Sequence, residues 1–239
     1  GATTIAYRWQ QNTGTVEEPV WEDIDGATDA TLTIPGDQSY VNKVVRVVAT
    51  TTDELGGKTD FVGDGQTIGN VNDEPTGSVT ISGTATQGEV LTAISTLVDE
   101  DGLGTISYQS QADGTDIEGE TANTLNLTQA QVGKVITVVA SYTDGFDTDE
   151  SVISAATVAV ENVDDEASGD LAVTGVAQEG GALVASLTNV ADPDGATTTA
   201  YRWQQNTGTV EGPVWEDIDG ATDATLTIPG DQSYVNKVV

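Results

Sequence analysis

The sequence contains no cysteine, no histidine and no methionine in 239 residues. These absences exclude zinc sites, thiol nucleophiles and Ser-His-Asp catalysis in their usual forms. The absence of cysteine does not indicate the cytosol, because an exported protein can do without disulfides if something else holds it together. There is no signal-peptide pattern and no apolar run near the roughly 18 residues that cross a membrane as a helix. We therefore expect a mature, soluble segment with no direct membrane insertion.

Positive charge and aromatic side chains are also scarce. Only 7 Lys and Arg residues stand against 39 Asp and Glu, which gives a formal net charge of −32. Phosphate backbones are bound by clusters of Lys and Arg, so nucleic acid is not an expected partner. The aromatic fraction is 5% and the apolar fraction is 37%. That apolar content is low, but it is enough for the cores of small β-sandwiches.

Internal repetition is the most prominent feature of the chain, and it sets the expected domain organisation. Residues 1–45 recur as 195–239 with two differences, Ile5 against Thr199 and Glu18 against Gly212. A weaker repeat lies within this period, because G-S-V-T-I-S-G at 77–83 matches G-D-L-A-V-T-G at 169–175. We expect one complete repeat at 76–167, the C-terminal part of a repeat at 1–75 and the N-terminal part of a repeat at 168–239.

The complete repeat has the pattern of an all-β domain. Alternating apolar residues, many Thr and Val residues, and frequent Gly and Asp turns predict short strands and no long helix. Seven short strands in about 92 residues are typical of an immunoglobulin-like β-sandwich. We therefore predict tandem sandwiches arranged end to end. The expected strands are 77–83, 89–97, 105–112, 115–118, 123–128, 134–143 and 151–160.

Acidic residues concentrate at the joints between repeats. The chain reads N-V-N-D-E-P at 70–75 and N-V-D-D-E-A at 162–167. If the seven strands alternate in direction, the incoming linker, the loop between the second and third strands, and the loop between the last two strands meet at one end. The loops of the repeat that follows each linker are acidic as well. The candidate ligands are Asn72, Asp73, Glu74, Asp99, Asp101, Asp144, Asp147 and Asp149 at the first joint, Asp164, Asp165, Glu166, Asp192 and Asp194 at the second, and Asp53 in the first fragment.

Carboxylates gathered in this way would repel one another unless a cation lay among them. Two like charges about 4 Å apart repel by about 4 kcal/mol at an effective dielectric constant near 20. Ca²⁺ reverses the sign, since it takes six to eight oxygen ligands in a flexible shell. Mg²⁺ needs a stricter octahedron and is the weaker candidate. The sequence thus predicts calcium at the joints.

Other interpretations remain open. Asp and Gly are ordinary turn residues, and a high net charge also keeps surface proteins soluble. Trp9 and Trp203 fit the core position of a sandwich strand, and Trp21 is also expected to pack, although Trp9 or Trp21 could stack on a sugar. Paired carboxylates can hydrolyse glycosides, but acidic loops that occur in every repeat fit a structural role better than a single active site. No enzymatic activity is expected.

The chain resembles a known family over essentially its whole length. G-S-V-T-I-S-G-T-A-T-Q-G-E-V-L-T-A from residue 77, D-E-D-G-L-G-T-I-S-Y-Q from residue 99 and L-T-Q-A-Q-V-G-K-V-I-T-V-V-A-S-Y-T-D from residue 127 look like the immunoglobulin-like extender domains of large bacterial RTX adhesins. The linker N-V-N-D-E-P is similar to the calcium linkers of cadherins. That similarity carries over to Asn72 and Asp73 here and, by position, to Asp164 and Asp165.

The resemblance implies an extracellular function at a bacterial cell surface. Such a segment would be a calcium-stiffened spacer that projects a distal ligand-binding region away from the cell. Its expected partners are calcium ions and neighbouring repeats of the same chain, and it is expected to be monomeric. The alternative is a β-sandwich module that binds carbohydrate or another surface polymer.

Overall fold

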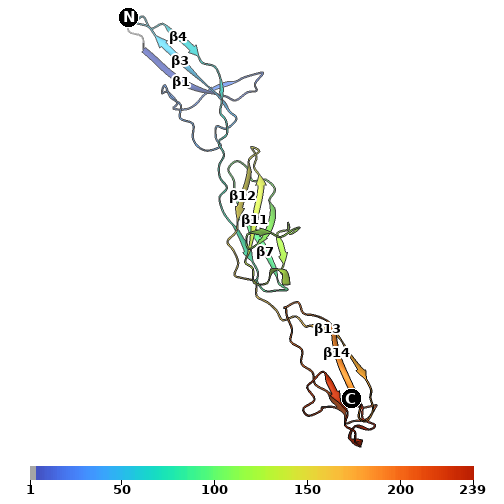
Figure 1. Cartoon of the computed structure of the whole chain (residues 1–239). Helices are drawn as coiled ribbons and strands as arrows, with labels where there is room; N and C mark the ends of the chain where they lie inside the picture. Colours follow the sequence, from blue (N-terminus) through green and yellow to red (C-terminus); the bar gives the residue numbers. More distant parts are fainter. Residues whose placement is uncertain (1–3) are drawn as a thin grey trace. The chain divides into compact units, whose positions relative to one another are not determined.

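The structure is a computed structural model that describes residues 4–239. Strands dominate it, and all the sheets are antiparallel (Figure 1). The all-β prediction is therefore confirmed. No helix among the described residues is long and apolar enough to cross a membrane.

The chain forms two compact units, and the first comprises residues up to Ala85, Glu89–Leu127 and Gly133–Val160. The second comprises Thr86–Gly88, Thr128–Val132 and Glu161–Val239. The predicted division at 75 and 167 stays a prediction.

The first sheet of the first unit is built around a long strand that is rich in β-branched residues. The run Val-Val-Arg-Val-Val-Ala-Thr-Thr-Thr forms its centre, as expected for residues that fit a pleated surface. The strand order is β2-β1-β3-β4, with β5 also paired to β3. These strands are β1 (Thr4–Asn12), β2 (Trp21–Asp23), β3 (Val44–Thr52), β4 (Lys58–Val62) and β5 (Gln66–Thr67).

Two further sheets of the first unit form a sandwich-like pair. One has the order β10-β7-β6 and the other has the order β12-β11-β8-β9. All seven strands expected in the complete repeat are present. They are β6 (Val79–Ser82), β7 (Val90–Ser95), β8 (Ser107–Ala112), β9 (Thr115–Asp116), β10 (Thr124–Asn126), β11 (Ile136–Thr143) and β12 (Asp149–Ile153).

The core of this pair follows the period-2 pattern of β11. Every second residue of that strand is buried, from Ile136 through Val138 and Ala140 to Tyr142. Val138, Ala140 and Tyr142 pack against residues of the other sheet, among them Val79 of β6. Burying a side chain of this size contributes about 1.5–3 kcal/mol, so the two sheets depend on each other for stability.

The last strand of the repeat is shorter than the predicted 151–160, because the segment after Ile153 is bulged. Ser154, Thr157 and Val160 donate their amide N–H groups to Val138, Ile136 and Lys134, so three residues on one side span two on the other. The hydroxyls of Ser154 and Thr157 accept from the amides of Val138 and Ile136, both at 3.0 Å. Side chains thus replace part of the regular ladder.

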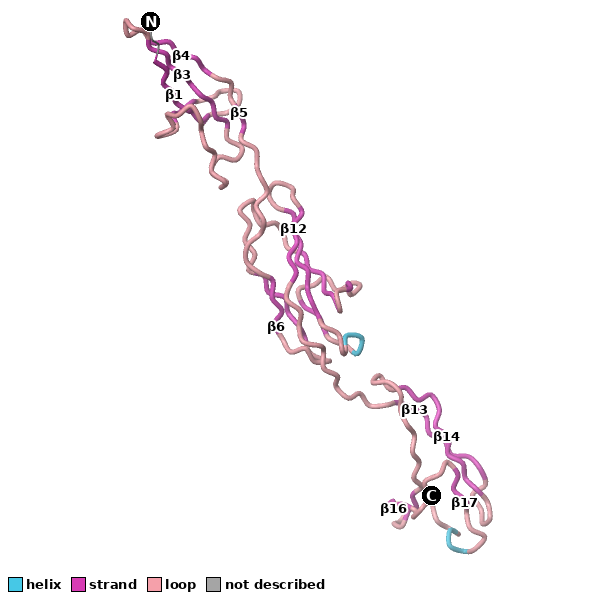
Figure 2. The backbone as a smooth tube through the Cα atoms, turned by 60° about the vertical axis from the view of Figure 1, so that its left-hand side comes forward, coloured by secondary structure: helices cyan, strands magenta, loops and turns pink. Residues whose placement is uncertain are grey.

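The second unit contains two smaller sheets and two short 3-10 helices, coloured cyan in Figure 2. The sheets have the orders β13-β14-β17 and β15-β16. Its core includes Leu183 and Ala185 of β14 together with Trp203. The elements are β13 (Ser168–Gly175), β14 (Ala182–Ala191), β15 (Gln204–Asn206), β16 (Trp215–Asp217), β17 (Thr225–Thr227), η1 (Gln129–Gln131) and η2 (Gln232–Tyr234).

The two near-identical copies adopt different secondary structure where their partners differ. Residues 4–12 form a nine-residue strand that pairs with β3, whereas 198–206, which differ only at Thr199, form the three-residue strand β15. Conversely, Thr225–Thr227 pair with β14, but the same residues at 31–33 form no strand. A neighbouring strand, and not local propensity, decides whether these residues enter a sheet.

Candidate metal-binding joints

The first linker is anchored to the loop between β7 and β8. Thr76 and Val98 form an isolated β-bridge, in which each donates its amide N–H to the other's carbonyl at 2.8 and 2.9 Å. This pair fixes the end of the linker beside the start of the loop that carries Asp99 and Asp101. The sequence expectation that the linker meets this loop is borne out by that contact.

The β7–β8 loop holds its two aspartates inside the protein. Asp99 and Asp101 are buried, and Asp99 Oδ1 accepts the amide N–H of Asp101 at 2.8 Å. Gly102 then turns the chain in the left-handed region, with φ of +102°, a conformation that favours glycine. Asp-x-Asp-Gly therefore forms a tight turn that keeps both carboxylates within the loop.

The linker contacts two acidic residues directly, one in the β7–β8 loop and one in β12. The amide N–H of Asp73 donates to Asp101 Oδ2 at 2.7 Å. The side-chain amide of Asn72 donates to Glu150 Oε1 at 2.8 Å. Glu150 lies in β12 and is buried, so the linker is bonded both to the β7–β8 loop and to the sheet that contains β12.

The loop between β11 and β12 supplies a third acidic residue. Asp144 is buried, and its Oδ1 accepts the amides of Phe146 and Thr148, both at 2.8 Å. Asp144 Oδ2 is buried and has no hydrogen-bond partner. A buried oxygen left without a partner costs about 1–3 kcal/mol, so a donor or a cation at this atom would stabilise the loop.

The two loops touch through their backbones. The amide N–H of Gly145 donates to the carbonyl of Asp101 at 3.0 Å. A Cβ atom at Gly145 would lie 2.5 Å from that carbonyl oxygen, so only glycine permits this approach. The contact holds the Asp144 loop against the Asp101 loop.

Tyr142 lies close to several of these carboxylates, and their charges affect the pKa of its hydroxyl. Its buried hydroxyl donates to Asp99 Oδ2 at 2.5 Å. Burial is the main cause that raises the pKa of Tyr142 well above its usual value, followed by the hydrogen bond to Asp99 and by the negative charges of Asp99, Glu150 and Asp144. The acidic side chains of both loops therefore act on one phenol.

Several predicted ligands lie outside this cluster. Asp149 accepts from the hydroxyl of Thr143, and Asp147 is exposed in the left-handed region with φ of 65°. Glu74 is exposed. Asp53 accepts the amides of Leu55 and Gly57, which places it in the β3–β4 turn and not at the linker. Glu150 is the buried carboxylate that was missing from the predicted set.

The second joint repeats part of this arrangement within the second unit. The amide N–H of Asp165 donates to Asp194 Oδ2 at 2.7 Å, and Asn162 donates to Asp194 Oδ1 at 2.8 Å. The hydrogen bond from the Asp165 amide is the larger cause that lowers the pKa of Asp194, and the bond from Asn162 is the next. Asp192 Oδ1 accepts the amide of Asp194 at 2.9 Å, as in the first loop. Asp164 and Glu166 are exposed.

Two glutamines that were not predicted also reach the joints. Gln38 donates to Asp73 and Asp101 at the first joint, and Gln87 donates to Asp165 at the second. A signal was present for one of them, because Gln38 recurs as Gln232 in the 194-residue repeat. A neutral glutamine, however, does not by itself indicate a contact with acidic residues.

The donor atoms at the joints are of the kind that a hard cation binds, but the acidic side chains are too far apart to coordinate one. Their donors are carboxylate and amide oxygens, which suit Ca²⁺, and Asp144 contributes an oxygen without a partner. No Lys or Arg occurs in 70–76, 98–102 or 143–151 to neutralise them. Across residues 4–239, however, no three acidic side chains lie close enough together to hold a metal ion as they stand. Binding would need side chains to turn.

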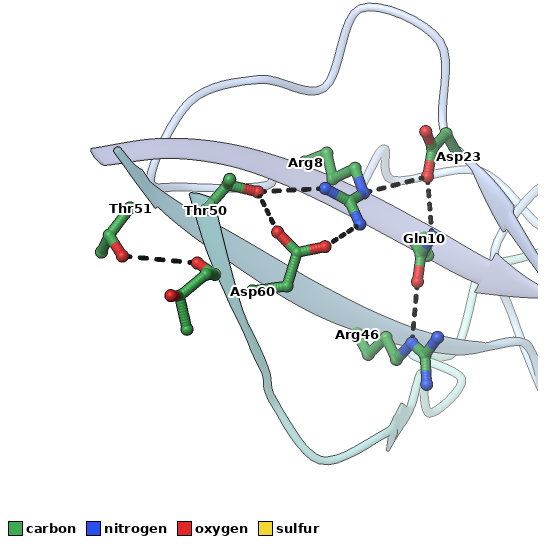
Figure 3. A network of polar contacts seen from close by, with 8 residues as sticks. Arg8, Gln10, Asp23, Arg46, Thr50, Thr51 and Asp60 are labelled. Atoms are coloured by element: carbon green, nitrogen blue, oxygen red, sulfur yellow. Dashed lines mark hydrogen bonds and ion pairs between the residues drawn. The ribbon is translucent and has the colours of Figure 1, made fainter. Parts of the chain in front are cut away.

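A separate polar network lies on the first sheet, far from these residues in sequence (Figure 3). Arg8 donates to Thr50 and to Asp60 at 3.1 and 2.9 Å, and Asp60 also accepts from Thr50 at 2.6 Å. These hydrogen bonds raise the pKa of Arg8 and lower the pKa of Asp60. The ion pair between Arg8 and Asp60 lies on an exposed strand face and contributes little to stability for that reason.

Trp203 and its copy Trp9 behave as packing residues, whereas Trp215, the copy of Trp21, is 47% exposed. Trp203 is buried in a core, and its indole N–H donates to the carbonyl of Asp223 at 2.9 Å. Trp9 makes the same bond to Asp29 at 3.0 Å and is half-buried. Arg46 covers the ring of Trp21 at 4.0 Å from its centre. Binding of a surface polymer stays a prediction without a specific observation in its favour.

Comparison of the chain with models of protein families and with curated protein sequences finds no match.

Proposed function

We propose that this chain is part of the extender region of a bacterial cell-surface adhesin. In this function, tandem β-sandwich domains act as spacers, and calcium ions at their joints limit bending. The chain would be extracellular and monomeric, and its partners would be calcium and its own neighbouring repeats. The acidic composition and the repeats support this proposal.

The immunoglobulin-like character of each repeat is part of the proposal. The sheets β10-β7-β6 and β12-β11-β8 correspond to strands E-B-A and G-F-C of an immunoglobulin-like sandwich, and β9, paired with β8, takes the place of C′. This order supports an immunoglobulin-like sandwich for 76–167. The repeat pattern supports the same fold for the domains to which 1–75 and 168–239 belong.

One observation carries the calcium proposal, namely the buried Oδ2 of Asp144, which has no hydrogen-bond partner. Asp99, Asp101 and Glu150 are buried nearby in the same set of loops, with Tyr142 and Gly145 connecting them. Leaving these carboxylates charged and without a cation is unfavourable. Bound Ca²⁺ would supply the missing positive charge and would accept oxygen ligands in an irregular shell.

The residues proposed to hold the ion come from three segments. Asn72 and Asp73 belong to the linker, Asp99 and Asp101 belong to the β7–β8 loop, and Asp144 and Glu150 follow β11. An ion bound by all three segments would restrict the linker relative to the sandwich that follows. Extracellular calcium modules bind with dissociation constants of about 10⁻⁴–10⁻³ M, so such sites would fill outside the cell and stay empty in the cytosol.

The proposal is tested by comparing calcium with chelator. We expect calcium to raise the thermal unfolding temperature and to narrow the distribution of dimensions measured by small-angle X-ray scattering. Asp144→Asn should weaken both effects, because it removes the charge of the partnerless carboxylate. Asp116→Asn is the matched control, since Asp116 is exposed and contacts Gln111 in a hairpin. Identical melting and scattering in calcium and chelator would overturn the proposal.

A further inference from the structure

At the first joint, one glutamine connects three segments of the chain. Gln38 lies in the turn before β3 and is half-buried. Its side-chain nitrogen Nε2 donates to Asp101 Oδ1 at 2.6 Å and to Asp73 Oδ2 at 3.1 Å. The same nitrogen lies 3.1 Å from Asn70 Oδ1. A neutral amide therefore sits between the carboxylate of the linker and the carboxylate of the loop that follows.

At the second joint, a glutamine from a different place in the repeat makes the corresponding contact. Gln87 lies in the turn between β6 and β7, and Thr86–Gly88 belongs to the second unit. Its Nε2 donates to Asp165 Oδ2 at 2.6 Å, and its Oε1 accepts the amide N–H of Val163 at 3.2 Å. The backbone N–H of Gln87 donates to the backbone carbonyl of Glu161 at 2.9 Å.

Both joints contain the same chain of hydrogen bonds. A glutamine amide binds Oδ2 of the linker aspartate, which is Asp73 in one joint and Asp165 in the other. The amide N–H of that aspartate then donates to Oδ2 of the loop aspartate at 2.7 Å in each case. Gln38 and Gln87 occupy different positions of the repeat, so the shared target is the linker aspartate.

We propose that Gln38 and Gln87 are inter-repeat latches that hold the linker aspartate in place without a metal ion. Hydrogen bonds to charged groups are stronger than those between neutral groups. A glutamine also adds no charge to an acidic site and does not titrate. The latch keeps the linker backbone against the loop aspartate when calcium is absent. This inference does not rest on the proposed calcium function.

The test is amide hydrogen exchange of the full chain in chelator, read at Asp73 and Asp165. Gln38→Ala should accelerate exchange at Asp73 by roughly tenfold and leave Asp165 unchanged. Gln87→Ala should do the reverse, so that each variant is the control for the other. Exchange at Ala140, in the buried centre of β11, should be unaffected in both variants and shows that the sandwich stays folded.

A second variant separates the latch from any effect on folding. Gln38→Glu should place a third carboxylate beside Asp73 and Asp101, so exchange at Asp73 in chelator should be at least as fast as in Gln38→Ala. Unchanged exchange at Asp73 in both Gln38 variants would overturn the latch, whatever calcium does. Failure of calcium to bind would overturn the proposed function and leave these results in chelator intact.

Discussion

The hydroxyl of Tyr142 donates to Oδ2 of Asp99 at 2.5 Å, and both side chains are buried. This bond joins the end of β11 to the β7–β8 loop, which connects the two sheets of the sandwich. It gives the carboxylate of Asp99 one of its two partners, the other being the amide of Asp101. The core of the sandwich and the acidic joint are thus mechanically linked through a single phenol.

Tyr142→Phe should destabilise the complete repeat by about 1–3 kcal/mol, because it leaves a buried carboxylate oxygen without its donor. Urea denaturation in chelator measures this change. Tyr108→Phe is the control, since Tyr108 is half-buried beside the same core. An equal loss in the two variants would mean that the bond to Asp99 contributes nothing specific.

The raised pKa of Tyr142 predicts a loss of stability at high pH. The unfolded phenol ionises near its ordinary value of 10.0, while burial and the neighbouring acids keep the folded phenol neutral. The stabilisation is therefore full below pH 10.0 and declines as the pH rises above it. Calcium should lower the pKa of Tyr142 by neutralising nearby carboxylates. Tyrosinate absorbance, compared between the wild type and Tyr142→Phe, measures both effects.

The lowered pKa of Asp194 predicts that the second joint loosens in acid. Its folded carboxylate stays charged at a pH where the unfolded group, with an ordinary value of 3.8, takes up a proton. The contribution is present above pH 3.8 and is lost as the pH falls through the lower folded value. The chemical shift of the Asp165 amide should follow this titration. In Asp194→Asn that step should vanish, and its persistence would assign it to another group.

Gly145→Ala should separate the two acidic loops. The new Cβ would meet the carbonyl of Asp101 at 2.5 Å, so the backbone contact between the loops must open. We expect a destabilisation of about 1–3 kcal/mol and weaker calcium binding, measured by denaturation and by calorimetry. Gly36→Ala is the control, because a Cβ there has no neighbour within 4 Å. Unchanged calcium affinity in Gly145→Ala would show that the loop contact is not needed for binding.

The strands of the complete repeat could be predicted because their apolar residues alternate. The end of β12 could not, because Ser154 and Thr157 replace ladder contacts with their hydroxyls and both residue types also suit a regular strand. Residues 198–203 show a different limit. Their copy at 4–9 is a strand beside β3, so no reading of the local sequence distinguishes the two.

The acidic joint was predictable in outline and not in detail. The alternation of strands indicated that the linker would meet the β7–β8 loop, and the bond from Asp73 to Asp101 confirms that contact. Glu150 was expected in the exposed loop just before the predicted strand 151–160, whereas it lies in β12 and is buried. Gln38 was missed because a charge-based search passes over neutral side chains, although its amide binds two of the predicted aspartates.

The central claim is that a calcium ion lies among the linker, the β7–β8 loop and Asp144. Diffraction from crystals grown in about 1–10 mM calcium, at or above the affinity range of extracellular modules, tests it most directly. The account predicts anomalous density within about 2.3–2.6 Å of Asp144 Oδ2 and of oxygens from Asp101 or the linker. Crystals in calcium that show water or no density beside Asp144, with these carboxylates still bonded only to the protein, would contradict it.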